Sequence, residues 1–505
     1  MSIHDLYLLS PEISLAAVAV MVVLVDLLNG RKSQMSTVAV VGLAIPLFFT
    51  VLLWGEISNW WSLIGPQVGE VNGYSLSTLH GTLSVDRFAL FFKFLFISSV
   101  GIVFLGSYGY VERFPDRRGE FHVLIMISSV GMMLMAAGTE LITLYVALEL
   151  STLPLVALAA FGGDRRSSEA GMKYLVLGAI ASAVLLYGMT LTFGFTGSTN
   201  LEMMAVAVGN AANTGSNEFG VPLLAVGVIL MVAGFGFKIA VVPFQGWVPD
   251  VYEGSPVPVT AFLSVASKAA GFAVIIRVFA TTFESIEVDW ALLFAGIAAL
   301  SMTIGNLVAI AQTNIKRLLA YSTIAHAGYM LVGLAAVASR TSDGVSLGTE
   351  TLLFYLGGYA VTNLAAFFAI IAIMDRTRSE LIESFAGMGR RAPWLALALT
   401  IALLSLTGIP PTVGFMAKLF VFGAAIKADL AWLVTLGAVN SVISAYFYLR
   451  VIRVMYFSEP TLEERTTRVV PLDISVAVTS TAVIGLGLWP YGMLKVASRA
   501  VEQLF

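Results

Sequence analysis

The sequence contains no cysteine, few histidines and few charged residues. Without cysteine, the chain cannot form disulfide bonds or cysteine-ligated iron–sulfur or zinc sites. Four histidines in 505 residues argue against a haem or a multi-histidine metal site. Only 12% of the residues are charged, against roughly 25% in soluble domains. The net charge of −3 is small, which argues against a nucleic-acid partner.

Hydrophobic residues make up 58% of the chain, and 46 glycines raise the apolar share further. Soluble domains contain roughly 45–50% apolar residues when glycine is included. A soluble fold could not bury the additional apolar surface, because even a domain of about 300 residues buries only about 75% of its surface. The composition therefore excludes an ordinary soluble enzyme and a disordered protein, and it predicts an all-α polytopic membrane protein.

Apolar runs of about 20 residues predict fourteen membrane-spanning helices. The first run lacks the basic start and cleavage site of a signal peptide, so we expect it to be a retained span. Span 12 is too long for one simple crossing and contains Pro410-Pro411 and Gly414, so we expect a broken helix there. Weak alternation from Val71 to Asp86 favours a hairpin. The predicted spans are residues 11–28, 36–54, 87–109, 121–138, 140–161, 171–196, 221–243, 257–281, 290–311, 318–338, 350–374, 394–426, 430–457 and 471–491.

Basic residues are concentrated in alternate loops of this predicted topology. The loops that follow odd-numbered spans contain seventeen lysines and arginines, whereas those that follow even-numbered spans contain only Arg340 and Lys427. By the positive-inside rule, the odd-numbered loops are cytoplasmic. We therefore expect a multi-pass protein of a prokaryotic cell (inner) membrane with both termini on the outer side.

Four ionisable residues fall deep inside predicted spans: Glu149, Lys238, Lys268 and Lys418. One lysine at the centre of a membrane helix costs about 2.5–3.5 kcal/mol on insertion scales. These residues could form structural ion pairs, but one carboxylate cannot neutralise three ammonium groups. Burial disfavours a charged lysine and a nearby carboxylate favours it, so small rearrangements can change its protonation. We interpret the four residues as a proton relay.

Other basic residues in or beside the spans have a simpler interpretation. Arg87, Lys93 and Arg277 lie near span ends, where their side chains are expected to reach the lipid headgroups. Lys173 opens span 6, and for it both the same interpretation and a functional one stay open.

Lys238 and Lys418 each lie close to a predicted helix break. Lys238 lies five residues before Pro243, and Lys418 lies seven residues after Pro411. Proline removes a backbone hydrogen bond, and such breaks at matching positions of two halves are typical of inverted repeats in transporters. Spans 4–8 and 9–13 contain five helices each, and an odd number per repeat forces opposite orientations. The sequence thus predicts an N-terminal three-helix segment (1–120), two repeats (121–281 and 290–457) and a C-terminal helix (471–505).

Span 10 adds further polar residues to the predicted interior. Tyr321, Ser322, His326 and Tyr329 lie in one membrane helix, and Ser322 and His326 share a face because they are four residues apart. A lone histidine in a helix is usually a satisfied core residue. Beside a lysine relay, the role of a proton carrier for His326 is equally open.

These motifs resemble the subunit N family of bacterial respiratory complex I, the proton-pumping NADH:quinone oxidoreductase. Subunit N is one of its antiporter-like membrane subunits, and the resemblance extends from roughly residue 85 to 460. The chain ends too soon for the lateral helix of the sister subunit L. The matching stretches are ELSTLPL (149–155), SSEAGMKYLVLGA (167–179), FKIAVVPFQGWVPDVYEGSPVPVTAFLSVASKAAGF (237–272), NIKRLLAYSTIAHAGYML (314–331) and LTGIPPTVGFMAKLFVF (406–422).

The resemblance implies roles for individual residues. Glu149 would pair with Lys238 in the first half-channel, Lys268 would be the central relay, and Lys418 would be the terminal lysine of the second half-channel. The secondary positions that match the family are Lys173, His326, Ser322 and Tyr321. One position departs from the pattern, because Gln245 stands where the family usually has a histidine. Glutamine carries no charge, so another group would have to replace any relay role of that histidine.

The resemblance also implies the surroundings of the chain. The chain itself would bind no cofactor, and NADH, FMN, iron–sulfur clusters and quinone would belong to partner subunits. Its partners would be the L- and M-type antiporter-like subunits, their small neighbours and the lipid bilayer. The alternatives are a subunit of a cation/proton antiporter, of a membrane-bound hydrogenase or of a ferredoxin-dependent photosynthetic-type complex. A stand-alone secondary transporter and a structural membrane scaffold are the rivals from other classes.

Overall fold

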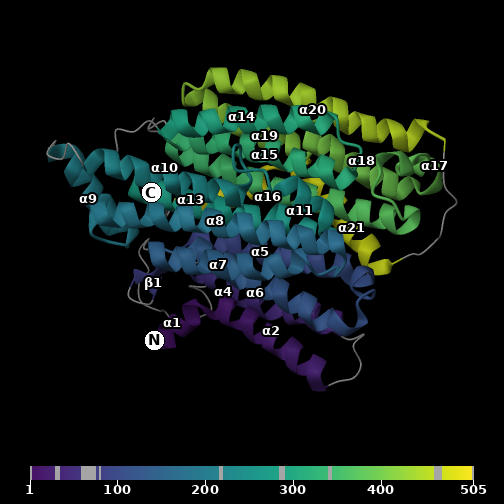
Figure 1. The fold of residues 1–505 in the computed structure, drawn as a ribbon, viewed down its shortest axis with the longest axis horizontal. Coiled ribbons are helices and arrows are strands. Elements are labelled where there is room, and N and C mark those ends of the chain that lie inside the picture. The colour runs from purple at the N-terminus through teal and green to yellow at the C-terminus, as the bar shows by residue number, and fades with distance from the viewer. Residues whose placement is uncertain are drawn as a thin grey trace.

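A computed structural model describes residues 3–28, 35–57, 76–78, 81–214, 220–283, 290–338, 344–459 and 469–502. Most of these residues are helical, and the helices lie side by side as a bundle (Figure 1). The N-terminal part consists of α1 (Ile3–Leu8), α2 (Ser10–Leu28), α3 (Met35–Gly42), α4 (Ala44–Ile57), β1 (Leu76–Thr78), β2 (Leu83–Val85) and α5 (Arg87–Val111).

Two further groups of helices follow along the chain. The first group contains η3 (Pro115–Arg117), α6 (Arg118–Ala137), α7 (Leu141–Ala159), α8 (Arg165–Thr196), α9 (Leu201–Thr214), α10 (Gly220–Ile239), α11 (Val248–Gly254), α12 (Val257–Phe262), the π-helical turn η4 (Leu263–Ser267) and α13 (Lys268–Thr282). The second contains α14 (Trp290–Ile310), α15 (Ile315–Ala338), α16 (Gly344–Thr377), η5 (Ile382–Phe385), α17 (Met388–Arg391), α18 (Pro393–Thr407), α19 (Val413–Lys427) and α20 (Ala431–Phe457), and it is followed by α21 (Val470–Leu488) and α22 (Tyr491–Val501).

The predicted all-α membrane architecture is confirmed. Within the described ranges, thirteen helical stretches are long and apolar enough to cross a membrane. Predicted span 12, 394–426, is divided into α18 and α19, so the break expected at Pro410-Pro411 is present. Span 7 is also interrupted: α10 ends at Ile239, and α11 begins only at Val248.

The two five-span groups pack in corresponding ways. In the first group α6 packs on α7 and α8 packs on α10, and in the second α14 packs on α15 and α16 packs on α19. Figure 1 shows the N-terminal helices α2 and α4 at one edge of the bundle, the first group beside them, and α14 and α20 at the opposite edge. Both chain ends lie at the same end of the bundle (Figure 1).

The described residues of the predicted hairpin do pair as two strands, whereas residues 71–75 and 79–80 lie outside the described ranges. Strands β1 and β2 pair antiparallel, with Leu76 opposite Val85. Asp86 follows β2 directly and caps α5, because its side chain accepts a hydrogen bond from the Ala89 backbone N–H at 2.7 Å.

Two basic residues that were expected to reach the headgroups are buried ion-pair members instead. Lys93 has no exposed surface, and its Nζ lies 2.8 Å from Glu12 Oε1. Arg277 is 5% exposed, and its guanidinium lies 2.9 Å from the Asp86 carboxylate. The snorkelling prediction is wrong for both, because each cation has a carboxylate from a distant helix or helix cap as a buried partner.

Candidate functional site

Lys238 lies in the last turn of α10, directly before the first helix break. Its side chain is buried at 4% exposure, and the ammonium group donates hydrogen bonds to Thr152 Oγ1 at 2.7 Å and Ser151 Oγ at 3.1 Å. Both hydroxyls belong to α7, the helix that also carries Glu149. Lys238 is therefore held by neutral oxygen atoms of the predicted partner helix.

Glu149 and Lys238 do not form the direct ion pair that the resemblance implies. No ion pair between them exists in the structure, in which both residues are described. The Glu149 carboxylate instead accepts a hydrogen bond from Ser182 of α8. Ser182, Thr152 and Lys238 all line a gap of about 10 Å³, roughly the space that one water molecule needs. The other residues around this gap are apolar and Glu149 does not line it, so Ser182 is the side chain that links the Glu149 carboxylate to the surroundings of Lys238.

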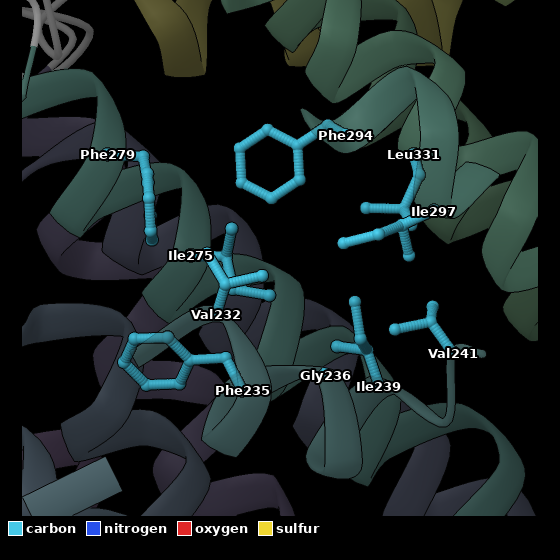
Figure 2. A pocket seen from close by; sticks show the side chains of 10 residues that line it. All are labelled: Val232, Phe235, Gly236, Ile239, Val241, Ile275, Phe279, Phe294, Ile297 and Leu331. Atoms are coloured by element: carbon cyan, nitrogen blue, oxygen red, sulfur yellow. The ribbon is translucent and has the colours of Figure 1, made fainter. Parts of the chain in front are cut away.

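A second gap of about 10 Å³ lies on the other side of α10 and has the opposite character (Figure 2). Its walls come from α10, α13, α14 and α15 and contain only apolar side chains, such as Phe235, Ile275 and Phe294. Apolar cavities of this size stay dry. This contact between the two repeats therefore blocks water, so a polar route between them has to run elsewhere.

Lys268 follows a π-helical turn at the centre of the bundle. The turn spans Leu263–Ser267, and π-helical turns inside α-helices are frequent at functional sites. Lys268 is 2% exposed, and its Nζ donates a hydrogen bond to the Thr323 carbonyl oxygen of α15 at 2.6 Å. The ring of Tyr359 lies 5.6 Å away. The side chain thus reaches from the first repeat into the second.

The stem of Lys238 packs against the helix that carries Lys268. A Cβ atom added to Gly271 would lie 3.3 Å from Lys238 Cγ. Gly271 is three residues after Lys268, so the two lysines are about one helical turn apart along α13. The close approach requires glycine at this position.

The polar residues of span 10 connect Lys268 to further hydroxyl groups of the second repeat. Thr323 Oγ1 and Tyr359 OH are 2.8 Å apart, and His326 Nδ1 lies 2.8 Å from Tyr355 OH. The His326 ring also packs near the rings of Tyr329 and Tyr359. His326 is thus placed between the surroundings of Lys268 and those of Lys418.

The remaining residues predicted in span 10 have different environments. Ser322 is buried and hydrogen-bonded to the hydroxyl of Tyr448. Tyr321 is half-buried, and within the described chain it makes no hydrogen bond with the relay residues. Four further polar residues were not predicted from the sequence, where they look like ordinary helix residues in apolar runs: Thr323, Tyr355, Tyr359 and Tyr448.

Lys418 lies on α19, after the second helix break, and is 5% exposed. Its ammonium group donates to the carbonyl oxygens of Thr407 at 2.9 Å and Leu406 at 3.3 Å. It also donates to Ser441 Oγ at 3.2 Å, and this hydroxyl lies 3.3 Å from Tyr329 OH. Lys418 Nζ lies 4.4 Å from the centre of the Tyr329 ring. Its partners are therefore neutral, as they are for Lys238 and Lys268.

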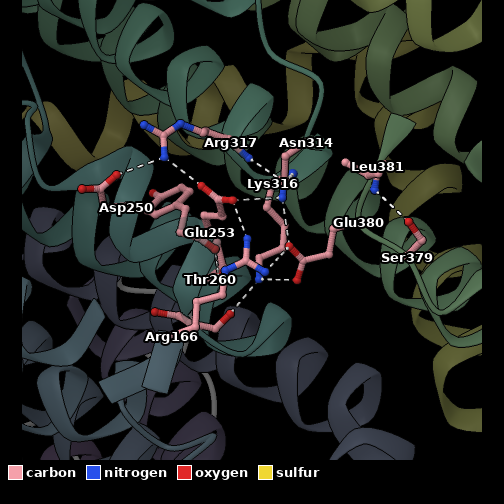
Figure 3. Close-up of polar contacts among 12 residues, drawn as sticks. Arg166, Asp250, Glu253, Thr260, Asn314, Lys316, Arg317, Ser379, Glu380 and Leu381 are labelled. Carbon is pink, nitrogen blue, oxygen red and sulfur yellow. Dashed lines mark hydrogen bonds and ion pairs between the residues drawn. The ribbon is translucent and has the colours of Figure 1, made fainter. Parts of the chain in front are cut away.

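Lys173 belongs to a charged cluster at the end of the bundle rather than to the buried set. Its side chain is 40% exposed and contacts Glu169 and Asp250, each at 2.8 Å. The cluster joins α8 and α11 of the first repeat to the start of α15 and the 378–381 segment of the second (Figure 3). Its members are Arg166, Glu169, Lys173, Asp250, Glu253, Lys316, Arg317 and Glu380.

Two carboxylates of this cluster, those of Asp250 and Glu253, are held in their charged form. Partial burial alone would raise the pKa of Asp250, but Lys173 and Arg317 outweigh burial and lower it. Partial burial likewise opposes the effect of Arg317 and Arg166 on Glu253, and the net result is a lowered pKa. The cluster therefore acts as a set of charge-neutralising clamps between the two repeats.

Gln245 lies in the segment between α10 and α11, at the position where the resemblance expects histidine. It is half-buried, and its side-chain oxygen has no hydrogen-bond partner among the described residues. Among all the residues that the structure describes, no group of three or more histidine, aspartate or glutamate side chains is placed to hold a metal ion.

Comparison with known proteins identifies close relatives over the whole chain. The family described as NADH:quinone oxidoreductase/Mrp antiporter, TM, matches residues 138–444. NADH-quinone oxidoreductase subunit N of Dehalococcoides mccartyi is 42% identical over 99% of both chains. Subunit N of Trichlorobacter lovleyi is 39% identical and covers 99% of this chain and 98% of its own. A chain of respiratory complex I from Thermus thermophilus with bound aureothin is 31% identical with a TM-score of 0.77, over 97% of this chain and 99% of that one.

Proposed function

Because the chain belongs to the subunit N family of NADH-quinone oxidoreductase, we propose that it is a proton-translocating membrane subunit of such a complex. In this proposal NADH oxidation and quinone reduction take place in partner subunits, with their FMN and iron–sulfur clusters. This chain contributes Glu149, Lys238, Lys268 and Lys418 as a proton relay. The L- and M-type antiporter-like subunits are its neighbours in the membrane.

The observation that carries the proposal is the difference between two kinds of buried cation. Lys93 and Arg277 each contact a carboxylate, as expected of structural ion pairs. Lys238, Lys268 and Lys418 are equally buried, but in the described part of the chain their hydrogen-bond partners are only hydroxyl and carbonyl oxygens. Such oxygens can accept hydrogen bonds from both a charged ammonium and a neutral amine. These three lysines can therefore gain and lose a proton without leaving a buried carboxylate unpaired.

The proposed sequence of events begins at Glu149. Movement of the Glu149 carboxylate toward Lys238 favours the ammonium form of Lys238. Movement of the carboxylate away favours release of a proton from Lys238. The proton then passes to Lys268, along the hydroxyl groups around Thr323 and His326, and on to Lys418. Moving one charge across 100 mV costs about 2.3 kcal/mol, which the rearrangement of one ion pair in a poorly solvated site can supply.

The two five-helix repeats, 121–281 and 290–457, would each form one half-channel in this proposal. The N-terminal segment 1–120 and the C-terminal segment 471–505, which was predicted as one helix and contains α21 and α22, would flank them. The shared position of both marked chain ends supports a topology with both termini on one side of the membrane (Figure 1). The distribution of basic residues predicts that this side is the outer one. The charged cluster around Asp250 and Arg317 would then lie at the cytoplasmic surface. Lys173, Ser322, His326 and Tyr321 remain secondary candidates, and Tyr321 has the least support from its contacts.

The test uses the intact complex in sealed vesicles. Lys268→Met should allow assembly but abolish proton pumping driven by NADH, because methionine keeps the volume of the side chain and cannot carry a proton. Lys427→Met, at an exposed lysine of α19, is the matched control and should pump like the parent. Full pumping by an assembled Lys268→Met complex would exclude the relay.

A further inference from the structure

A groove separate from the relay lies between the N-terminal helices and the second repeat. It has a volume of about 460 Å³ and is lined by side chains of α4, α5, α16, α21 and α22. Its walls are almost entirely apolar, apart from Ser98 and Ser99 of α5. This volume falls within the range of about 300–1,000 Å³ that is typical of ligand sites.

The depth of the groove corresponds to one leaflet of a bilayer. On α5 it extends from Phe91 to Ile102, a separation of eleven residues and so a rise of roughly 16 Å along a helix. The hydrocarbon core of a bilayer is about 30 Å thick, so the groove covers about half of it. At its shallow end lie Trp54, Leu486 and α22, and at its deep end lies Leu364 of α16.

The short helix α22 marks the membrane–water interface at the shallow end. Trp489 and Tyr491, directly before and at its start, are 73% and 65% exposed, and aromatic residues of this kind gather at the headgroup level. Ala497 and Ala500 face the bundle, and Met493 and Val496 line the groove. The helix is thus amphipathic and lies across the mouth of the groove.

Two exposed basic side chains lie on this helix beside the mouth. Lys495 and Arg499 are four residues apart and so share one face of α22. Neither forms an ion pair with any residue that the structure describes. The nearby Arg87 is already paired with Glu502 at 3.1 Å, and Glu56 accepts a hydrogen bond from Tyr7. Among the described residues of these helices, Lys495 and Arg499 are therefore the cations that can meet a ligand at the mouth.

We propose that this groove binds one acyl chain of an anionic phospholipid, whose headgroup contacts Lys495 and Arg499. The apolar walls match the acyl chain, the depth matches one leaflet, and the two cations match a phosphate group. Each basic residue close to an anionic lipid surface contributes about 1 kcal/mol, or roughly a fivefold preference over a zwitterionic lipid. The bound lipid fills the contact between the N-terminal helices and the second repeat.

The test uses the intact complex in phosphatidylcholine vesicles that contain either phosphatidylglycerol or phosphatidylcholine with a photoactivatable group on the acyl chain. After illumination, labelled peptides are identified by mass spectrometry. We expect labelled peptides from α5 and α16 around Ser98 and Leu364, with a several-fold preference for phosphatidylglycerol. Lys495→Ala with Arg499→Ala should remove that preference. The pair Lys427→Ala with Arg453→Ala, at exposed positions of α19 and α20, should keep it.

A second variant tests the groove without altering charge. Ser98 is exposed and lines the groove, so Ser98→Phe should fill it and stop labelling by both lipids. Val442→Phe, at a position of α20 that is 75% exposed, is the control of similar size and should label normally. No labelling of α5 or α16 in the parent, equal labelling by both lipids, or cross-linking of these helices to a partner subunit in place of lipid would each overturn the proposal.

Discussion

The ammonium nitrogen of Lys418 lies 2.9 Å from the carbonyl oxygen of Thr407, the last residue of α18. Lys418 follows its helix break along the chain, whereas Lys238 precedes its own. In space the difference disappears, because Lys238 lies in the last turn of α10 and Lys418 reaches back to the last turn of α18. The Lys418 ammonium thus lies at the carboxyl end of the helix before its break, where the helix dipole favours a cation, whereas the Lys238 ammonium is turned toward the hydroxyls of α7.

Replacing Lys418 tests whether this arrangement serves proton transfer. Lys418→Met removes the titratable group together with its hydrogen bonds to the carbonyls of Leu406 and Thr407. We expect the complex to assemble and to lose proton pumping, measured by a pH-sensitive dye in sealed vesicles. Lys418→Arg keeps a donor but binds its proton too tightly for transfer, so it should stabilise the break and still fail to pump. Normal pumping by Lys418→Arg would show that Lys418 only caps α18.

The buried pair of Lys93 and Glu12 should behave as a structural element. Lys93→Met leaves the Glu12 carboxylate buried and alone, and breaking a buried pair in this way costs about 3–5 kcal/mol. Lys93→Met combined with Glu12→Gln removes both charges and should recover most of the lost stability. The measurement is the temperature at which the purified complex unfolds. A double variant that is no more stable than Lys93→Met would contradict a structural role of the pair. A stable double variant that assembles but cannot pump would also contradict it.

Gly131 provides a test of how precisely Lys238 is positioned. A Cβ atom at Gly131 would lie 2.5 Å from the backbone nitrogen of Ser151, whose hydroxyl holds the Lys238 ammonium. Gly131→Ala should push α6 and α7 apart, destabilise the protein by about 1–3 kcal/mol and lower the pumping rate. Gly194→Ala is the control, because nothing lies within 4 Å of its added Cβ atom. In a helix that change should be neutral or stabilising by up to about 1 kcal/mol. Equal effects of the two substitutions would rule out the packing argument.

The sequence predicted the spans, the breaks and the isolated lysines because each is a local signal. Apolar runs give the spans, and proline and glycine give the breaks near Pro243 and Pro410. Helix ends that extend beyond the apolar runs were harder to predict from the sequence. Helix α8 begins at Arg165, six residues before the predicted span, since its polar first turns do not register as hydrophobic. The side chain of Asp164, which accepts a hydrogen bond from Ser167 N–H, is a capping signal that could have corrected this start.

Contacts between distant helices could not be predicted from local patterns. Lys93 and Glu12 are far apart in the sequence, and only the packing of α2 on its neighbours reveals them as partners. Rotation of α7 turns the hydroxyls of Ser151 and Thr152, rather than the Glu149 carboxylate, toward Lys238. Tyr355 and Tyr359 become part of the polar route only because α16 packs against α15. Helix orientation is a tertiary property, and a hydropathy pattern does not contain it.

The charged cluster at the end of the bundle predicts a pH-dependent contribution to stability. The pKa of Asp250 is lower in the folded protein than in the unfolded chain, because Lys173 and Arg317 outweigh the opposing effect of partial burial. A lowered folded-state pKa means that the stabilisation is present above the unfolded value, about 3.9, and is lost as the pH falls through the folded value. Asp250→Asn should therefore unfold at a lower temperature than the parent at pH 7, and the difference should shrink in acid.

The expected size of this effect is small, and a control is needed. Asp250 is 34% exposed, so solvent screening limits its ion pairs to about 1 kcal/mol or less. Glu120→Gln, at an exposed position of α6 outside the cluster, should show no difference from the parent at any pH. A deficit in Asp250→Asn that stays constant between pH 7 and acid would mean that the side chain acts through shape or neutral hydrogen bonds, and the clamp between the two repeats would not be electrostatic.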